Sequence, residues 1–132
     1  MRTVCEILKD SKNIAVYGLS DKPGRISRDI ALFLKRKGFN VVGVNPLAKS
    51  NEVDGITIYG SLKDVPFEID IVDVFRRSEA IPEIIDDVMA IRPKVLWLQS
   101  GIRNDQAVAP VIELGIDTIQ DKCIMVEYNS CL

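Results

Sequence analysis

The stretch Asn13-Ile14-Ala15-Val16-Tyr17-Gly18, followed by Leu19-Ser20-Asp21-Lys22-Pro23-Gly24-Arg25, decides the fold of this chain. An apolar run that ends in a glycine predicts a strand buried on both faces. An amphipathic run over residues 27–37 comes next and predicts a helix with Ser27 as its N-cap. A buried strand, a loop and an amphipathic helix form the first half of a βαβ unit.

The same alternation continues to the end of the chain. Further strands are predicted over residues 41–44, 57–59, 69–75, 95–98 and 117–119. Helices are predicted over residues 3–10, 79–90 and from Asn104 or Asp105 onward, the last one kinked or delayed by Pro110, and residues 47–56 are predicted to be a polar loop. Parallel strands joined by right-handed helical crossovers form a sheet covered on both faces. The sequence therefore predicts an α/β fold, a doubly wound, mainly parallel, Rossmann-like sheet of five to six strands, with residues 1–132 as a single domain.

The composition excludes several classes of protein. The 132 residues include 17 Lys and Arg against 19 Asp and Glu, a net charge of −2, so no overall positive field favours nucleic acid or an anionic membrane. The chain contains 0 histidines, which excludes catalytic sets with histidine and any phosphohistidine step. The N-terminus lacks the apolar region of a signal peptide, and no apolar run approaches the roughly 18 residues of a membrane span. We expect a cytoplasmic protein that does not enter a membrane.

The three cysteines are far apart in the sequence and form no CxxC pair. Their spacing and odd number argue against a disulfide framework and against a zinc ribbon. We expect Cys123 to be a small buried residue and Cys131, near the end of the chain, to be an exposed thiol. No metal site is expected.

The loop after the first strand has the character of an anion site. In doubly wound sheets, ligands bind beyond the carboxyl ends of the strands. This loop leads into a helix N-terminus, where free backbone N–H groups and the helix dipole favour an anion. Ser20 and Ser27 add hydroxyl groups, and Lys22 and Arg25 add positive charge, so the segment predicts a phosphate or diphosphate site. A plain turn in which Ser27 only caps the helix explains this segment equally well.

Two departures argue against a standard NAD site. The usual GxGxxG pattern would place glycines at positions 18, 20 and 23, but positions 20 and 23 are Ser20 and Pro23. The second strand ends in Asn45-Pro46 where an NAD site has a carboxylate for the ribose hydroxyls. Lys49, which follows shortly, suits a phosphorylated ribose better than a free one.

Five stretches of the chain, in order and at matching spacing, resemble the small, single-domain CoA-binding proteins of the Rossmann type. They are Val16-Tyr17-Gly18-Leu19-Ser20 with Pro23 and Arg25, Val42-Gly43-Val44-Asn45-Pro46, Ile71-Val72-Asp73-Val74-Phe75-Arg76-Arg77, Trp97-Leu98-Gln99-Ser100-Gly101-Ile102, and Asp121-Lys122-Cys123-Ile124-Met125-Val126-Glu127. The fold is also similar to the CoA-binding domain of the succinyl-CoA synthetase alpha subunit and of ADP-forming acyl-CoA synthetases. The chain departs from the family at Glu127-Tyr128, where members often have Glu-His.

The resemblance implies that CoA binds across the carboxyl edge of the sheet. It places the diphosphate against Gly18, Leu19, Ser20, Lys22, Pro23, Arg25 and Ser27. It places the adenosine 3′-phosphate beside Asn45, Pro46 and Lys49, the adenine and ribose beside Val74, Phe75 and Arg76, and the pantetheine beside Gln99 and Gly101. Taken alone, Phe75 fits a core position at a strand end better than an adenine contact.

We therefore predict a non-catalytic module that binds CoA or an acyl-CoA. The synthetases that it resembles use a phosphorylated histidine in a separate domain, and this chain has 0 histidines. Asp70 and Asp73 point to opposite faces of their strand and form no catalytic pair, although Asp73 is expected to pair with a loop cation or to accept from backbone N–H groups. Two alternatives remain: a partner-dependent subunit of an acyl-CoA ligase, and a redox sensor that binds NAD(H) or another nucleotide. A homodimer and a partner enzyme subunit are both left open.

Overall fold

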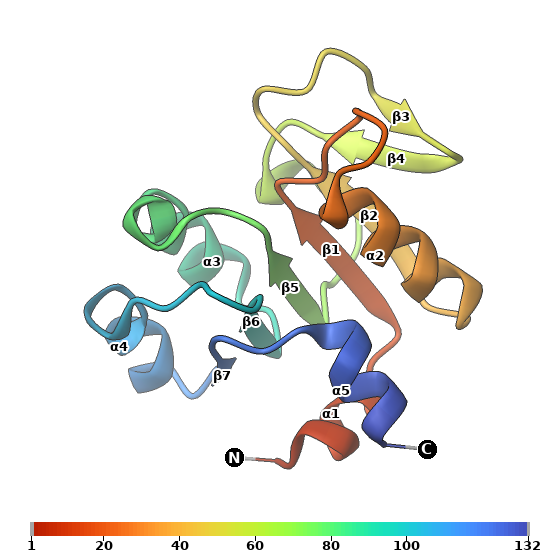
Figure 1. Ribbon diagram of the computed structural model, residues 1–132. Helices are drawn as coiled ribbons and strands as arrows, with labels where there is room; N and C mark the ends of the chain where they lie inside the picture. Colours follow the sequence, from red (N-terminus) through yellow and green to blue (C-terminus); the bar gives the residue numbers. More distant parts are fainter. Residues whose placement is uncertain (1, 132) are drawn as a thin grey trace.

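Strand β1 (Asn13–Tyr17) lies at the centre of the sheet in the computed structural model, which describes residues 2–131 (Figure 1). It pairs in parallel with β2 (Asn40–Val44) on one side and with β5 (Ile71–Val74) on the other. From β1 the chain builds the sheet first in one direction and then, starting with β5, in the other. The carboxyl ends of β1 and β5 therefore form the topological switch point at which such sheets bind ligands.

The complete sheet has seven strands in the order β3-β4-β2-β1-β5-β6-β7. Strands β4 (Ile56–Tyr59), β6 (Val95–Leu98) and β7 (Asp117–Ile119) pair in parallel with their inner neighbours, and β3 (Glu52–Val53) pairs antiparallel with β4. The predicted doubly wound, mainly parallel α/β fold is confirmed. The predicted number of strands was too low, since β3 lies in the segment predicted to be a polar loop.

The hairpin that contains β3 has a recognisable turn. Val53 pairs with Ile56, so Asp54 and Gly55 form a two-residue loop, and both have positive φ, 51° and 82°. Asp-Gly is a favoured pair for this kind of tight hairpin turn. The signal was present in the sequence, but a two-residue strand has no periodicity from which it could be predicted.

Helices cover both faces of the sheet (Figure 1). One face carries α1 (Val4–Asp10), α2 (Ile26–Arg36) and α5 (Ile124–Ser130). The other carries α3 (Ile85–Ile91), α4 (Asp105–Glu113) and the 3-10 segments η1 (Leu62–Asp64) and η2 (Ser78–Ile84). Alternation along β1 supplies both layers, because Ile14 and Val16 join the first core cluster while Ala15 and Tyr17 join the second.

Two prolines lie inside helical segments. The segment predicted as one helix over residues 79–90 begins as the 3-10 segment η2, which contains Pro82, and becomes α-helical only at Ile85. Pro110 does not delay α4, which starts at Asp105 with Asn104 as its N-cap. The Asn104 Oδ1 accepts a hydrogen bond from the Ala107 N–H at 3.0 Å, and this cap fixes the start of the helix before the proline.

The expectation that Cys131 is an exposed thiol was wrong, and the spacing that argued against a disulfide framework was misleading, since one disulfide is present. Cys5 in α1 and Cys131 at the end of α5 form a disulfide across a sequence separation of 126 residues, while Cys123 is free and half-buried. Helices α1 and α5 lie side by side on the same face of the sheet (Figure 1). Sequence spacing cannot reveal such a pair, because the fold alone brings the two ends of the chain together.

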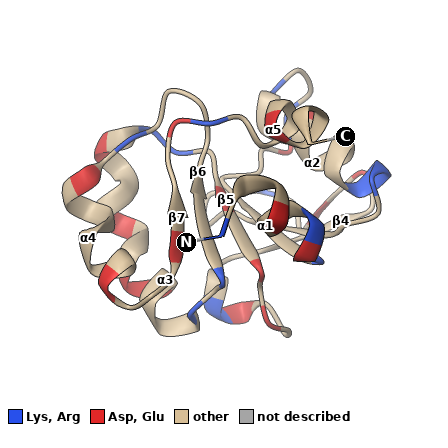
Figure 2. Cartoon of the chain, turned by 90° about the horizontal axis from the view of Figure 1, so that it is seen from below, with Lys and Arg blue, Asp and Glu red and all other residues tan. Residues whose placement is uncertain are grey.

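Charge is unevenly distributed over the helices. Helices α3 and α4 carry acidic residues and no Lys or Arg (Figure 2). Within residues 2–131, no helix has the length and hydropathy needed to cross a membrane.

Candidate functional site

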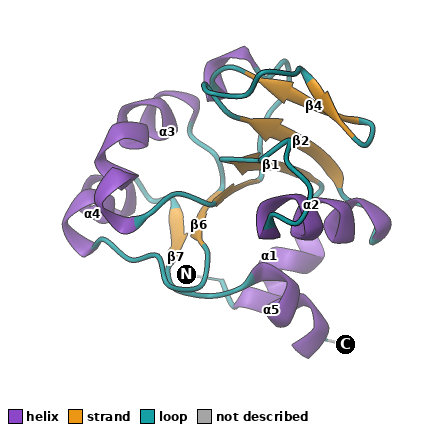
Figure 3. Ribbon diagram, turned by 45° about the horizontal axis from the view of Figure 1, so that its top comes forward, coloured by secondary structure: helices purple, strands orange, loops and turns teal. Residues whose placement is uncertain are grey.

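A cavity of about 270 Å³ opens at the switch point of the sheet, at the carboxyl end of β1. It is lined by Gly18, Ser20, Arg25, Ile26, Ser27 and Phe75. Figure 3 shows the loop between β1 and α2 at this edge, which is tilted toward the viewer. Five of the six lining residues belong to the set predicted from the sequence. Segments that are about 50 residues apart in the sequence thus meet at one place.

Gly18 allows the loops after β1 and β5 to come close together. Its φ is +88°, and its N–H donates to the Val44 carbonyl at 2.7 Å. A Cβ atom at this position would lie 2.5 Å from the Phe75 carbonyl oxygen. Only glycine combines this conformation with this approach, so Gly18 brings Phe75 to the edge of the cavity.

Asn45 joins the loop after β1 to the loop after β2. Its Nδ2 donates to the Leu19 carbonyl at 2.9 Å, and its Oδ1 accepts from the Leu47 N–H at 2.9 Å. Leu19 itself is fully buried and packs over Gly43, where an added Cβ would lie 2.5 Å from the Leu19 Cδ2. The side-chain amide of Asn45 is thereby committed to holding the two loops in place.

The N-terminus of α2 faces this cavity. The prediction of Ser27 as the N-cap was wrong, because the helix begins at Ile26 and Arg25 is the N-cap without a side-chain capping bond. Ser27 is buried within the first turn, and its Oγ accepts from the Ser20 N–H at 3.1 Å. The Ser20 Oγ accepts in turn from the Lys22 N–H at 3.1 Å. Among the described residues neither hydroxyl donates a hydrogen bond, so both can donate to an anion.

The remaining predicted residues are not part of the lining of this cavity. Lys22, Pro23, Pro46, Lys49 and Gly101 are exposed, Arg76 is half-buried, Gln99 is 4% exposed, and Leu19 and Val74 are fully buried. Leu19 and Val74 therefore present no surface, of side chain or backbone, to a ligand in this structure.

Gln99 and Gly101 belong to a separate part of this edge, beyond β6. The Gln99 Oε1 accepts from the Ile124 N–H at 3.0 Å, and the Gly101 N–H donates to the Asp121 Oδ1 at 2.7 Å. These bonds attach the segment that leads into α5 to the end of β6. Asp121 was not predicted to have this role.

Ile26 is the lining residue that the sequence analysis missed. Its side chain is 64% exposed at the first position of α2. Ile26 is not on the face of α2 that packs against the core. An apolar residue away from that face was the signal in the sequence that could have identified it. Its exposure gives the mouth of the cavity an apolar border.

Asp73 is a buried carboxyl group in β5, next to the core. Its side chain is 0% exposed, and neither of its oxygens has a hydrogen-bond partner among the described residues. Val16 and Trp97 are its neighbours in the pairing of β5 with β1 and β6. The expectation that Asp73 pairs with a cation or accepts from backbone N–H groups was wrong. Burial raises the pKa of Asp73 well above its ordinary value, because the charged form cannot be solvated.

Replacing Asp73 by valine should raise the free energy of unfolding at pH 7 by about 1–3 kcal/mol, the range for a buried polar group without a partner. Valine suits a central parallel strand and removes the unsatisfied oxygens. Chemical denaturation of both proteins measures the difference.

The pH dependence provides the control for this prediction. The folded chain binds a proton at Asp73 that the unfolded chain loses near pH 3.8, so stability should fall as the pH rises from about 3.8 toward the raised pKa. In the isosteric Asp73→Asn variant, this decrease of the free energy of unfolding with rising pH should be absent. Equal slopes for the wild-type protein and the variant would contradict a raised pKa.

The described residues contain no group of three or more Cys, Asp or Glu side chains that could hold a metal ion. The polar groups in the lining are one arginine and two serines, beside the N-terminus of α2.

Comparisons with known proteins identify the family of the chain. Residues 12–129 match the family described as the CoA binding domain. The uncharacterized protein YneT of Bacillus subtilis is 39% identical over 123 residues, which cover 93% of this chain and 90% of YneT. A solved structure from Thermus thermophilus, cell-free ID.343, superposes with a TM-score of 0.93 at 34% identity and covers 99% of this chain and 100% of that one.

A more distant relative is an enzyme subunit. The alpha subunit of an ADP-forming acetate–CoA ligase (I) of Pyrococcus furiosus is 25% identical over 128 residues, which cover 94% of this chain but 25% of the subunit. The chain thus spans about a quarter of that relative. The match over residues 12–129 is the finding that assigns the family, and the chain belongs to the CoA binding domain family.

Proposed function

We propose that the chain binds CoA or an acyl-CoA at the carboxyl edge of the sheet and does so without catalysing a reaction. One observation carries the proposal: the switch-point cavity is lined by an arginine, two serines and a phenylalanine at a helix N-terminus. These groups suit a ligand that is anionic in one part and flat and apolar in another.

The diphosphate is assigned to the N-terminus of α2. Arg25 offers a planar guanidinium group, and Ser20 and Ser27 offer hydroxyl hydrogens toward the same cavity. The first N–H groups of the eleven-residue helix α2 add partial positive charge. Lys22 is exposed beside this cavity and strengthens the local field.

The other parts of CoA are assigned to the neighbouring loops. Phe75 and Arg76 suit the adenine and ribose, because Phe75 is an aromatic residue in the lining of the cavity and the Arg76 side chain lies close to Gly18. Lys49, exposed in the loop after β2, suits the 3′-phosphate. The pantetheine arm would run toward Gly101 and the end of β6.

Binding without catalysis is proposed because the lining of the cavity offers no acid–base pair. None of its six residues is a carboxylate, and the chain has 0 histidines. Asp73, the carboxyl group whose pKa is raised, is fully buried. The proposed role is therefore to hold or deliver CoA.

Isothermal titration calorimetry with CoA tests the proposal. CoA should bind with a submillimolar Kd, 3′-dephospho-CoA more weakly and NAD more weakly still. Absence of heat with CoA at submillimolar concentration would refute CoA binding. Tighter binding of NAD than of CoA would favour the redox-sensor alternative.

Replacing Arg25 by alanine should weaken CoA binding about tenfold to a hundredfold, the loss expected for a charge-assisted hydrogen bond of about 1.5–3 kcal/mol. Calorimetric titration of the purified variant measures this loss.

Arg36→Ala is the matched control, since Arg36 is exposed at the opposite end of the same helix. It should leave the affinity for CoA unchanged. An equal loss in both variants would mean that general charge, rather than the position of Arg25, governs binding.

A second candidate is a subunit that acts with a partner as an acyl-CoA ligase. Ile26, at the start of α2, and Leu47, in the loop after β2, are 64% and 78% exposed, so a partner could cover these apolar side chains. The match to the ligase subunit from Pyrococcus furiosus points in the same direction. Native affinity purification that returns a stoichiometric partner and ligase activity would support this candidate.

A further inference from the structure

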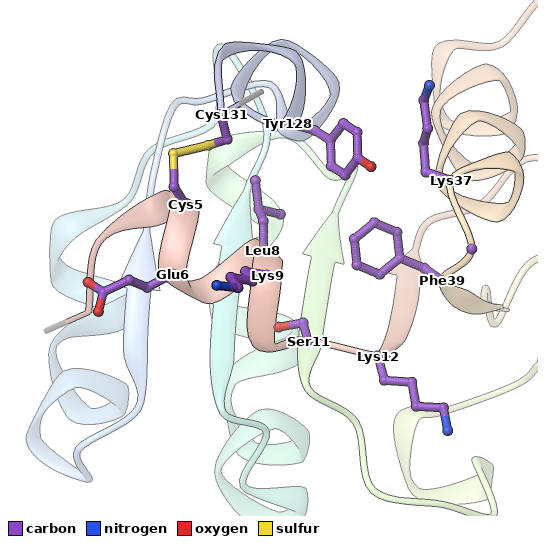
Figure 4. A pocket seen from close by; sticks show the side chains of 11 residues that line it. Cys5, Glu6, Leu8, Lys9, Ser11, Lys12, Lys37, Phe39, Tyr128 and Cys131 are labelled. Atoms are coloured by element: carbon purple, nitrogen blue, oxygen red, sulfur yellow. A yellow bond between two sulfur atoms is a disulfide. The ribbon is translucent and has the colours of Figure 1, made fainter.

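A second cavity, of about 560 Å³, is lined by residues from α1 and α5 and from the segments that precede β1 and β2 (Figure 4). Lys12 directly precedes β1 and Phe39 directly precedes β2, so the cavity lies at the amino ends of these strands. Helix α1 and the end of α5 complete its walls. The Cys5–Cys131 disulfide forms part of the lining, between these two helices.

The disulfide is accessible to a small molecule. Cys5 is exposed and Cys131 is half-buried, so the bond is not enclosed in the core. The cavity beside it has the volume of a typical small-molecule site, about 300–1,000 Å³. Accessible disulfides are the ones that exchange readily with thiols, whereas buried ones react only when the protein unfolds.

The cavity also carries positive charge. Lys9, Lys12 and Lys37 line it, and none of them forms a salt bridge with another described residue. The acidic residue in the lining is Glu6, whose Oε1 accepts from the Thr3 N–H at 2.9 Å and which points away from the rings of the cavity in Figure 4. Ammonium groups that line a cavity attract a negatively charged thiol into it.

We propose that the Cys5–Cys131 disulfide is an exchange site for small anionic thiols, which enter through this cavity. The incoming thiolate sulfur bonds to the Cys5 Sγ. The bond between the Cys5 and Cys131 sulfur atoms breaks, and its electron pair leaves on the Cys131 Sγ, which then takes a proton from water. The products are a mixed disulfide on Cys5 and a free Cys131 thiol, so the end of α5 is no longer covalently attached to α1.

A second thiolate completes the exchange. It attacks the small-molecule sulfur of the mixed disulfide and releases Cys5 as a thiolate, which takes a proton. Two small thiols are thereby oxidised to one disulfide, and the protein disulfide is reduced to two thiols. This site is independent of the proposed CoA site, which lies at the other edge of the sheet.

The test starts from the oxidised protein and uses reduced glutathione as the anionic thiol and 2-mercaptoethanol as the neutral one. Mass spectrometry after acid quenching should show one glutathione on the peptide that contains Cys5. The rate should rise in proportion to the concentration of glutathione and stay unchanged in urea concentrations below the unfolding transition. The proposal would be overturned if no mixed disulfide formed, or if the rate increased with urea at concentrations below the unfolding transition.

Charge selection is tested with a double variant, Lys12→Gln with Lys37→Gln. It should slow the reaction of glutathione about fivefold and leave that of 2-mercaptoethanol unchanged. The control variant, Lys63→Gln with Lys122→Gln, removes two exposed lysines outside the cavity and should react like the wild type. In the wild type, added salt should slow the reaction with glutathione and leave the reaction with 2-mercaptoethanol unchanged. Equal salt effects on the two thiols would overturn the selection of anionic thiols.

Discussion

Reduction of the Cys5–Cys131 disulfide should lower the free energy of unfolding by about 3–5 kcal/mol and the Tm by about 15 °C. The bond closes almost the whole chain into a loop, across a sequence separation of 126 residues. In the chain-entropy description, a longer loop restricts the unfolded state more, and about 5 kcal/mol is the limit for a loop of this size. Thermal unfolding followed by circular dichroism, with and without a reductant, measures the shift.

The Cys5→Ser, Cys131→Ser double variant is the control for this prediction. It should unfold at the temperature of the reduced wild-type protein and should not respond to the reductant. Cys123, which is free, remains unchanged in both proteins. Coincident unfolding of the oxidised and reduced wild type would mean that the bond adds no stability.

The strand–helix alternation was predictable because each central strand has its own local signal. Residues 13–18 form a short apolar run closed by glycine, and β1 lies where that run predicts it. The disulfide and strand β3 were not predictable in the same way. The first depends on packing between residues 126 positions apart, and the second has only two residues. Long-range packing and very short strands leave no periodic pattern.

The sequence predicted which loops form the candidate site, but it predicted the roles of individual side chains less well. Topology brings Gly18, Arg25 and Phe75 to one cavity, as the position of loops at strand ends predicts. The hydrogen bonds within the protein decide which polar side chains remain available to a ligand. Residue type alone does not reveal these bonds. The Ser27 hydroxyl accepts a hydrogen bond from the Ser20 N–H instead of capping its helix, and the Asn45 side chain joins two loops.

Replacing Gly18 by alanine should have a large effect on both stability and binding. A residue with a Cβ at φ +88° is strained by about 1–3 kcal/mol. The new Cβ would also lie 2.5 Å from the Phe75 carbonyl oxygen, an overlap that can be relieved only by moving the backbone. We expect a total loss of about 2–5 kcal/mol in the free energy of unfolding. Urea denaturation measures it.

Gly115→Ala separates the two causes of this loss. Gly115 has nearly the same φ, +85°, but a Cβ there meets nothing within 4 Å. It should therefore show the cost of the conformation alone, and the difference between the two variants is the cost of the overlap with Phe75. Since that overlap separates the loops that form the candidate site, Gly18→Ala should weaken CoA binding at least tenfold while Gly115→Ala leaves it unchanged. Equal destabilisation in both variants would contradict the close approach of Gly18 to Phe75, and with it the rigid junction on which the proposed CoA site depends.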